Sequence, residues 1–141
     1  MDRLNPLLRK YNVDHRRRTL AHDVVLTRYL DHAVLSCCDQ LTAAEAVVGT
    51  AMMLGVLEFD FPGKVFAFRF PIPDDGPALR RKHQQARRDY RLAKKWAAHF
   101  LIPDRLIDDL RREQPELGDF CERERLTQEL VLYRLNTLPG A

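Results

Sequence analysis

Two histidine–aspartate pairs, His22-Asp23 and Asp31-His32, have the residue types that could hold a metal ion. Imidazole nitrogens and carboxylate oxygens are both common zinc ligands. In an extended segment, however, neighbouring side chains point to opposite faces of the strand, so the two members of a pair cannot converge on one ion. The spacing therefore argues against a metal site built from these pairs.

Nucleophilic catalysis has few candidate residues. The cysteines are Cys37, Cys38 and Cys121, and Ser36 is the only serine. Neither Cys37 nor Cys38 stands at the start of a predicted helix, where the pKa of a thiol would be lowered. Adjacent cysteines in a strand do not readily bridge, and three free thiols suit a reducing compartment. We expect unreactive thiols and a cytoplasmic location.

The composition favours one globular domain over residues 1–141. The chain is long enough to bury a core, and its contents of 45% hydrophobic and 30% charged residues are ordinary for such a domain. Its apolar runs are far shorter than a membrane span, and no apolar signal segment stands at the N-terminus. We therefore expect no contact with a membrane.

The positive charge is concentrated in two places, although the net charge is only +3. One is the run Arg16-Arg17-Arg18, and the other is the segment 80–95, where Asp89 is the only acid. Such a cluster attracts an acidic protein or nucleic acid, although a solvated helix face is the commoner explanation. The predicted partner-binding residues are Arg80, Arg81, Arg87, Arg88, Arg91, Lys94 and Lys95.

The first third of the chain predicts a short helix and a β-hairpin. Asn5 is suited to an N-cap with Pro6 at the first helical position, which opens a helix to about Lys10. The β-branched and aromatic segments 23–30 and 33–38 predict the two strands of the hairpin. A helix through residues 20–35 is the alternative.

The remainder is mostly helical. Thr42 and Glu45 form a capping box, and the helix that follows to Leu57 is almost uncharged, so we expect it to be buried on most sides. A strand is predicted at 65–70, and helices at 78–101 (before Pro103), 105–113 and, as one helix or two, 119–138, after a loop at 114–118. The fold class is α+β, with a small antiparallel or mixed sheet packed on a helical bundle.

Three segments resemble the ImmA/IrrE family of small zinc-dependent endopeptidases. Their zinc helix ends in a motif like Ala-His-Glu-Leu-Gly-His, where this chain has Ala51-Met52-Met53-Leu54-Gly55-Val56. Their later helix resembles Tyr90-x-x-Ala93-x-x-Trp96-Ala97-Ala98-x-x-Leu101-Ile102-Pro103. Asp119-Phe120 and Tyr133-Arg134-Leu135-Asn136-Thr137-Leu138 are similar to the family's tail. The resemblance covers about residues 23–138 and implies a zincin-like metallopeptidase scaffold.

The resemblance also implies that the zinc chemistry is lost. Met52 and Val56 stand where the family has its paired histidines, Met53 replaces the general-base glutamate, and Tyr90 occupies the third ligand position. Zinc hydrolases need imidazole or carboxylate ligands and a base that accepts a proton from bound water. Methionine and valine supply neither at neutral pH. We expect no metal, no cofactor and no enzymatic activity.

Active relatives cleave DNA-binding repressors, often in prophages, mobile elements or stress responses. The resemblance therefore implies an inactive pseudo-protease that binds a protein, such as a DNA-binding repressor, and acts in transcriptional or phage/mobile-element regulation. The groove beside the former site and the basic helix would be its contact surfaces. The alternative is a nucleic-acid-binding module that uses the basic helix 80–95 and the run Arg16–Arg18.

Overall fold

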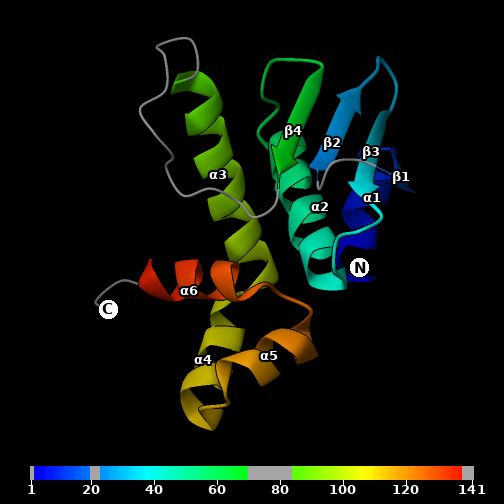
Figure 1. The fold of residues 1–141 in the computed structure, drawn as a ribbon. Coiled ribbons are helices and arrows are strands. Elements are labelled where there is room, and N and C mark those ends of the chain that lie inside the picture. The colour runs from blue at the N-terminus through cyan, green and yellow to red at the C-terminus, as the bar shows by residue number, and fades with distance from the viewer. Residues whose placement is uncertain (1, 20–22, 70–83, 138–141) are drawn as a thin grey trace.

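The computed structural model describes residues 2–19, 23–69 and 84–137, and these form an α+β arrangement with a small mixed sheet (Figure 1). The four strands are β1 (Val13–Arg18), β2 (Asp23–Arg28), β3 (Ala33–Cys38) and β4 (Val65–Arg69). Their order across the sheet is β1-β3-β2-β4. The predicted α+β class with a small sheet is confirmed.

The predicted hairpin is present. Strands β2 and β3 pair in antiparallel fashion, with Leu26 opposite Leu35, and the Tyr29 amide donates to the His32 carbonyl at 2.8 Å across the turn. The alternative helix over residues 20–35 is wrong. Strand β4 pairs antiparallel with β2 in agreement with the predicted strand at 65–70, of which Phe70 lies outside the described residues.

Strand β1 was not predicted from the sequence. It pairs with β3 in parallel, with Val13 opposite Ala33 and Arg18 opposite Cys38, and this pairing makes the sheet mixed. The basic run Arg16-Arg17-Arg18 is therefore the second half of a strand.

A short 3₁₀ turn, Asp2–Leu4, leads into α1 (Asn5–Lys10). The predicted span of the helix is confirmed, but the predicted cap is wrong. Leu4 is the N-cap and makes no side-chain capping bond, while Asn5 is already helical. Pro6 still lies in the first turn, where its missing amide costs no hydrogen bond.

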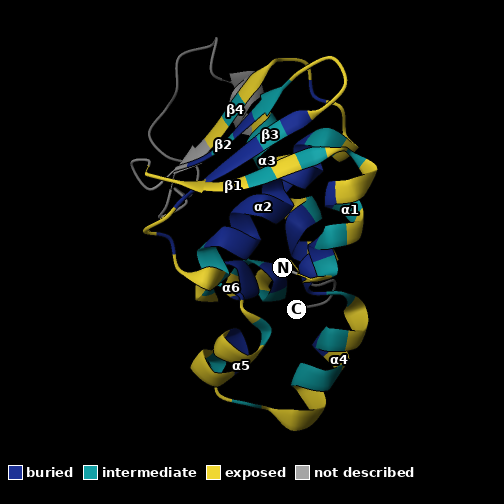
Figure 2. Ribbon diagram, turned by 90° about the vertical axis from the view of Figure 1, so that its right-hand side faces the viewer, coloured by how far each residue is buried: buried dark blue, intermediate teal, exposed yellow. Residues whose placement is uncertain are grey.

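Helix α2 (Ala43–Glu58) is the centre of the core. The capping box is present, since Thr42 accepts from the Glu45 amide and the Glu45 side chain accepts from the Thr42 amide. Every residue from Ala46 to Val56 is buried, which confirms the expectation of burial on most sides. Figure 2 shows α2 in dark blue beneath the sheet, and Figure 1 shows it between the sheet and α3.

Helix α3 (Gln84–Leu101) runs beside α2 and ends before Pro103, as expected. The predicted start near Ala78 lies outside the described residues. The last three helices gather at the end of α3 that is away from the sheet (Figure 1). They are α4 (Asp104–Glu113), α5 (Leu117–Glu124) and α6 (Gln128–Asn136).

The predicted segment 119–138 thus contains two helices, and the loop before it is shorter than expected because α5 begins at Leu117. Gln114 and Arg125 close α4 and α5 with positive φ angles of 48° and 53°, a conformation that glycine more often supplies. None of the described helices is long and apolar enough to cross a membrane.

Candidate functional site

The contact between α2 and α3 brings together two of the segments on which the resemblance rests. A Cβ atom added at Gly55 would lie 3.2 Å from Cε3 of Trp96 and 3.3 Å from both Cα and O of Ala93. The backbones therefore approach so closely that only glycine fits without a shift of its neighbours. Gly55 belongs to the first motif-like segment and Ala93 to the second.

The side chains that the resemblance aligns with the family's zinc ligands are part of the hydrophobic core. Met52, Met53 and Val56 are fully buried on α2, and Tyr90 of α3 is half-buried and packs against the core. The i, i+4 spacing places Met52 and Val56 on the same face of α2. In the described part of the chain, no three His, Cys, Asp or Glu side chains lie close enough together to hold a metal ion.

Apolar side chains at these positions stabilise the core. Each fully buried methionine or valine contributes about 1.5–3 kcal/mol relative to an exposed one. Methionine suits a gap of irregular shape because its side chain is unbranched and flexible. The side chains of Met52, Met53, Val56 and Tyr90 therefore all pack in or against the core.

The tail segment is tied to the end of α3 by a buried arginine. Arg134 of α6 is only 2% exposed, and its Nε donates to the carbonyl oxygen of Ile102 at 2.9 Å. Its Nη2 lies 2.7 Å from Oδ1 of Asp104, the first residue of α4. One side chain therefore fixes α6 against the junction between α3 and α4.

The structure describes four of the basic side chains that were predicted to bind a partner. Arg88, Arg91 and Lys95 are exposed and, at spacings of three and four residues, lie along one face of α3. Arg80 and Arg81 lie outside the described residues, and so does the side chain of Arg87.

Lys94 requires a correction, because it is only 7% exposed. Its ammonium lies 4.6 Å from the centroid of the Tyr133 ring on α6. A cation over an aromatic face is stabilised by the negative charge of the ring face, and the aliphatic stem of lysine packs against apolar neighbours. Lys94 therefore joins α3 to α6 and is not part of the exposed surface.

Sequence reasoning missed a polar cluster between the sheet and α2. His15 of β1 and Thr50 of α2 share a hydrogen bond of 3.2 Å between Nε2 and Oγ1. Cys37 Sγ lies 3.6 Å from the same His15 nitrogen and 3.7 Å from Thr50 Oγ1. The three residues come from three elements, so no local pattern in the sequence could indicate the cluster.

The protonation states in this cluster do not suit a thiol nucleophile. Burial raises the pKa of the Cys37 thiol, and it outweighs the lowering effects of the Thr50 hydroxyl and Arg17. Burial and the nearby charge of Arg17 also lower the pKa of His15. Both groups are therefore neutral near pH 7, whereas a reactive cysteine needs a thiolate beside a cation. The cluster satisfies the buried Thr50 hydroxyl on an otherwise apolar helix.

Of the other histidines that the structure describes, His32 and His99 are both exposed. His32 Nδ1 lies 2.7 Å from Oδ1 of its neighbour Asp31 at the tip of the hairpin, while His22 lies outside the described residues. His99 is exposed near the end of α3, where desolvation and the charge of Arg134 lower its pKa.

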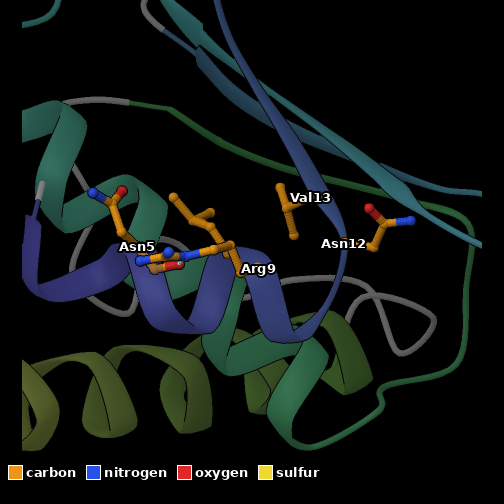
Figure 3. Close-up of a pocket in the computed structure, with 5 residues that line it drawn as sticks. Asn5, Arg9, Asn12 and Val13 are labelled. Carbon is orange, nitrogen blue, oxygen red and sulfur yellow. Dashed lines mark hydrogen bonds between the residues drawn. The ribbon is translucent and has the colours of Figure 1, made fainter.

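A concavity of about 530 Å³ lies between α1 and the start of β1. Figure 3 shows Asn5 and Arg9 on α1, with Val13 and Asn12 at the entry to β1. Leu8 also lines it. The Asn12 side chain donates to the Asp31 carbonyl at 3.0 Å, and this bond holds the start of β1 against the hairpin.

No protein-family model matches the chain, and no curated protein matches it with significant similarity.

Proposed function

We propose that this chain is a catalytically inactive, ImmA/IrrE-like pseudo-metallopeptidase that acts by binding a protein in transcriptional or phage/mobile-element regulation. The observation that carries the proposal is the contact of Gly55 with Ala93 and Trp96. The two motif-like segments are about forty residues apart in the sequence, and a zincin-like scaffold requires them to be in contact. Arg134 of the tail segment in turn binds the Ile102 carbonyl of the second segment.

The burial of the former ligand positions supports the loss of catalysis. An unfilled polar cavity between α2 and α3 would leave polar groups without partners at a cost of about 1–3 kcal/mol each. Met52, Met53 and Val56 instead continue the core without a polar atom that could hold zinc or activate water. A protein of this kind retains the shape of the enzyme and can act only through its surface.

The exposed face of α3 is the proposed contact surface. Arg88, Arg91 and Lys95 present three cations in a row, and we propose a DNA-binding repressor with an acidic face as the partner. The same row supports a second candidate, a direct contact with nucleic acid phosphates. The two candidates differ in the partner that the row binds, so one set of variants separates them.

The scaffold can be tested by rebuilding the metal site. In the double variant Met52→His/Val56→His, we expect zinc to raise the thermal midpoint, because two histidines one turn apart can share one ion. Adding Tyr90→Glu should raise the midpoint further in zinc. Adding Leu92→Glu, on an exposed part of α3, is the matched control and should not.

Cobalt(II) absorption of the same variants reports the number of ligands independently of stability. Equal effects of zinc on the Tyr90→Glu and Leu92→Glu variants would contradict the scaffold, since Tyr90 would then not face the pair on α2.

The function can be tested with any helix-turn-helix repressor whose gene neighbours the gene for this chain. We expect a stable complex in size-exclusion chromatography and an intact repressor by mass spectrometry, with or without added zinc. The variant Arg88→Glu/Lys95→Glu should lose the complex, whereas Arg105→Glu/Arg111→Glu on α4 should retain it. Cleavage that a chelator abolishes would refute the loss of catalysis. Binding to DNA that falls steeply with salt, without a repressor complex, would favour the second candidate.

A further inference from the structure

Strand β1 lies at an edge of the sheet, and one side of its backbone is not paired with any strand in the described part of the chain. The Asn12 carbonyl accepts from the Ala33 amide at 3.2 Å, and the Arg18 carbonyl accepts from the Asp39 amide at 2.8 Å. Both carbonyls therefore point toward β3. Backbone groups alternate in direction along a strand, so every second residue between them points the other way.

The outward row belongs to Val13, His15 and Arg17. Their amides and carbonyls face away from β3 and offer donors and acceptors at strand spacing. The His15 side chain reaches Thr50 of α2, so the side chains of these three residues share the face of the sheet that the helices cover. Val13, His15 and Arg17 thus direct their backbone groups away from β3 and their side chains toward the face of the sheet that the helices cover.

The opposite face of β1 is exposed and charged. Asp14, Arg16 and Arg18 point away from α2 and lie in solvent, and in Figure 2 the strand crosses the near side of the molecule with several exposed residues. Arg16 Nε donates to Asp14 Oδ2 at 2.8 Å, so Asp14 offsets part of the positive charge but leaves Arg16 exposed. Arg17 adds a further positive charge beside the strand, where it donates to the Leu41 carbonyl at 3.0 Å. The edge is positive as a whole.

A concavity marks the start of this edge. The space of about 530 Å³ between α1 and β1 has Leu8 and Val13 as apolar lining and Asn5, Arg9 and Asn12 as polar lining (Figure 3). It lies where the outward row of backbone groups begins. It can therefore receive the end of a chain that runs along the edge.

We propose that the β1 edge binds an extended acidic segment of a partner protein, which adds to the sheet as a further strand. The backbone of the segment bonds to the outward groups of Val13, His15 and Arg17. Its acidic side chains, at every second position, lie over Arg16 and Arg18, and strand addition of this kind gains affinity from the main chain and specificity from alternate side chains. The proposal does not depend on the proposed function, because it involves neither α3 nor the former metal positions.

Two other occupants fit less well. A second copy of the chain would bring two positively charged strands together, and like charges oppose such pairing. Nucleic acid would satisfy the arginines, but its phosphates carry no donors for the outward carbonyls and would leave those acceptors unpaired. Only an acidic peptide matches both the backbone row and the charge.

The test uses a fluorescein-labelled peptide of alternating glutamate and valine, with a peptide of alternating lysine and valine as the control. Amide exchange followed by NMR shows which backbone amides of β1 form hydrogen bonds with the peptide. In the free protein the outward amides of His15 and Arg17 should exchange quickly, and those of Arg16 and Arg18, which face β3, slowly. The acidic peptide should slow exchange at His15 and Arg17, and the basic peptide should not.

Charge variants give a second readout. Arg16→Glu/Arg18→Glu should weaken binding of the acidic peptide by about tenfold, while Arg105→Glu/Arg111→Glu on α4, with the same change in net charge, should leave it unchanged. All four side chains are exposed, so both variants should fold. The proposal is overturned if the acidic peptide does not bind, if exchange slows elsewhere instead, or if both variants lose binding equally. It is also overturned if β1 pairs with a second copy in solution, or if only a DNA duplex binds the edge.

Discussion

Replacing Gly55 with alanine tests the contact between α2 and α3 directly. The added Cβ would lie 3.2 Å from Trp96 Cε3 and 3.3 Å from two backbone atoms of Ala93, closer than ordinary van der Waals contact. The Trp96 ring is stacked on Phe100, with 5.1 Å between the centroids, and the Ala93 atoms belong to the helix itself. Neither neighbour can move alone, so the methyl group must push the helices apart or displace the indole.

Two opposing effects decide the sign of the change in stability. Alanine is favoured over glycine inside a helix by about 1 kcal/mol. Forcing an extra methyl group into a packed contact costs about 1–3 kcal/mol. We therefore expect a net loss of about 1 kcal/mol, which corresponds to a fall of about 2–4 °C in the thermal midpoint for a domain of roughly this size.

Gly118 provides a matched control for this prediction. It lies in α5 and is exposed, and a Cβ added there would meet nothing within 4 Å. The same substitution should therefore stabilise the protein by about 0.5 kcal/mol through the backbone alone. Urea unfolding of the two variants, compared by midpoint and slope, should give changes of opposite sign. If Gly55→Ala gained stability as Gly118→Ala does, the close approach of α2 and α3 would be refuted.

Two further predictions concern buried polar groups. Arg134→Met should lower the free energy of unfolding by about 2–3 kcal/mol, because it leaves the buried Ile102 carbonyl without its donor. Asp104→Asn should cost far less, since that carboxylate is 94% exposed, and equal losses in urea unfolding would contradict this reasoning. The lowered pKa of His15 means that the unfolded chain takes up a proton before the folded one as the pH falls below the ordinary value of 6.5. Stability should therefore decline from about pH 7 to about pH 5, and His15→Gln should flatten this decline more than His99→Gln. If the stability of His15→Gln fell with decreasing pH as steeply as that of the parent protein, this role of His15 would be contradicted.

Elements with strong local signals could be predicted from the sequence. The capping box at Thr42 and Glu45 fixes the start of α2 through bonds between residues three apart. Pro103 ends α3 because its ring disfavours helical geometry at the preceding residue. In each case the physical cause lies within a few residues.

Strand β1 could not be predicted because its support comes from elsewhere in the chain. The run from Val13 to Arg18 is mostly charged and has no alternation of apolar residues. It is a strand because it pairs with β3, about twenty residues later, and because His15 reaches Thr50 on α2. Parallel pairing between distant segments leaves no local pattern.

The basic helix shows how a charge pattern can mislead. Of the cations predicted to bind a partner, Arg88, Arg91 and Lys95 lie on an exposed face of α3. The prediction for Lys94 failed because α6 folds back and covers it with Tyr133. The position of α6 depends on Arg134 and its partners on another element, and periodicity within α3 contains no information about them.

The enclosure of α2 between the sheet and α3 also affects how the chain emerges during synthesis. The ribosome completes Glu58 roughly forty residues before Leu101, the end of the helix that covers the second face of α2. At about 5–20 residues per second, that interval lasts about 2–8 s. The same interval separates the emergence of α2 and α3 from the ribosome, and during it Gly55 and its neighbours are exposed to other nascent chains. A chaperone that binds apolar helices therefore has its best opportunity before α3 emerges.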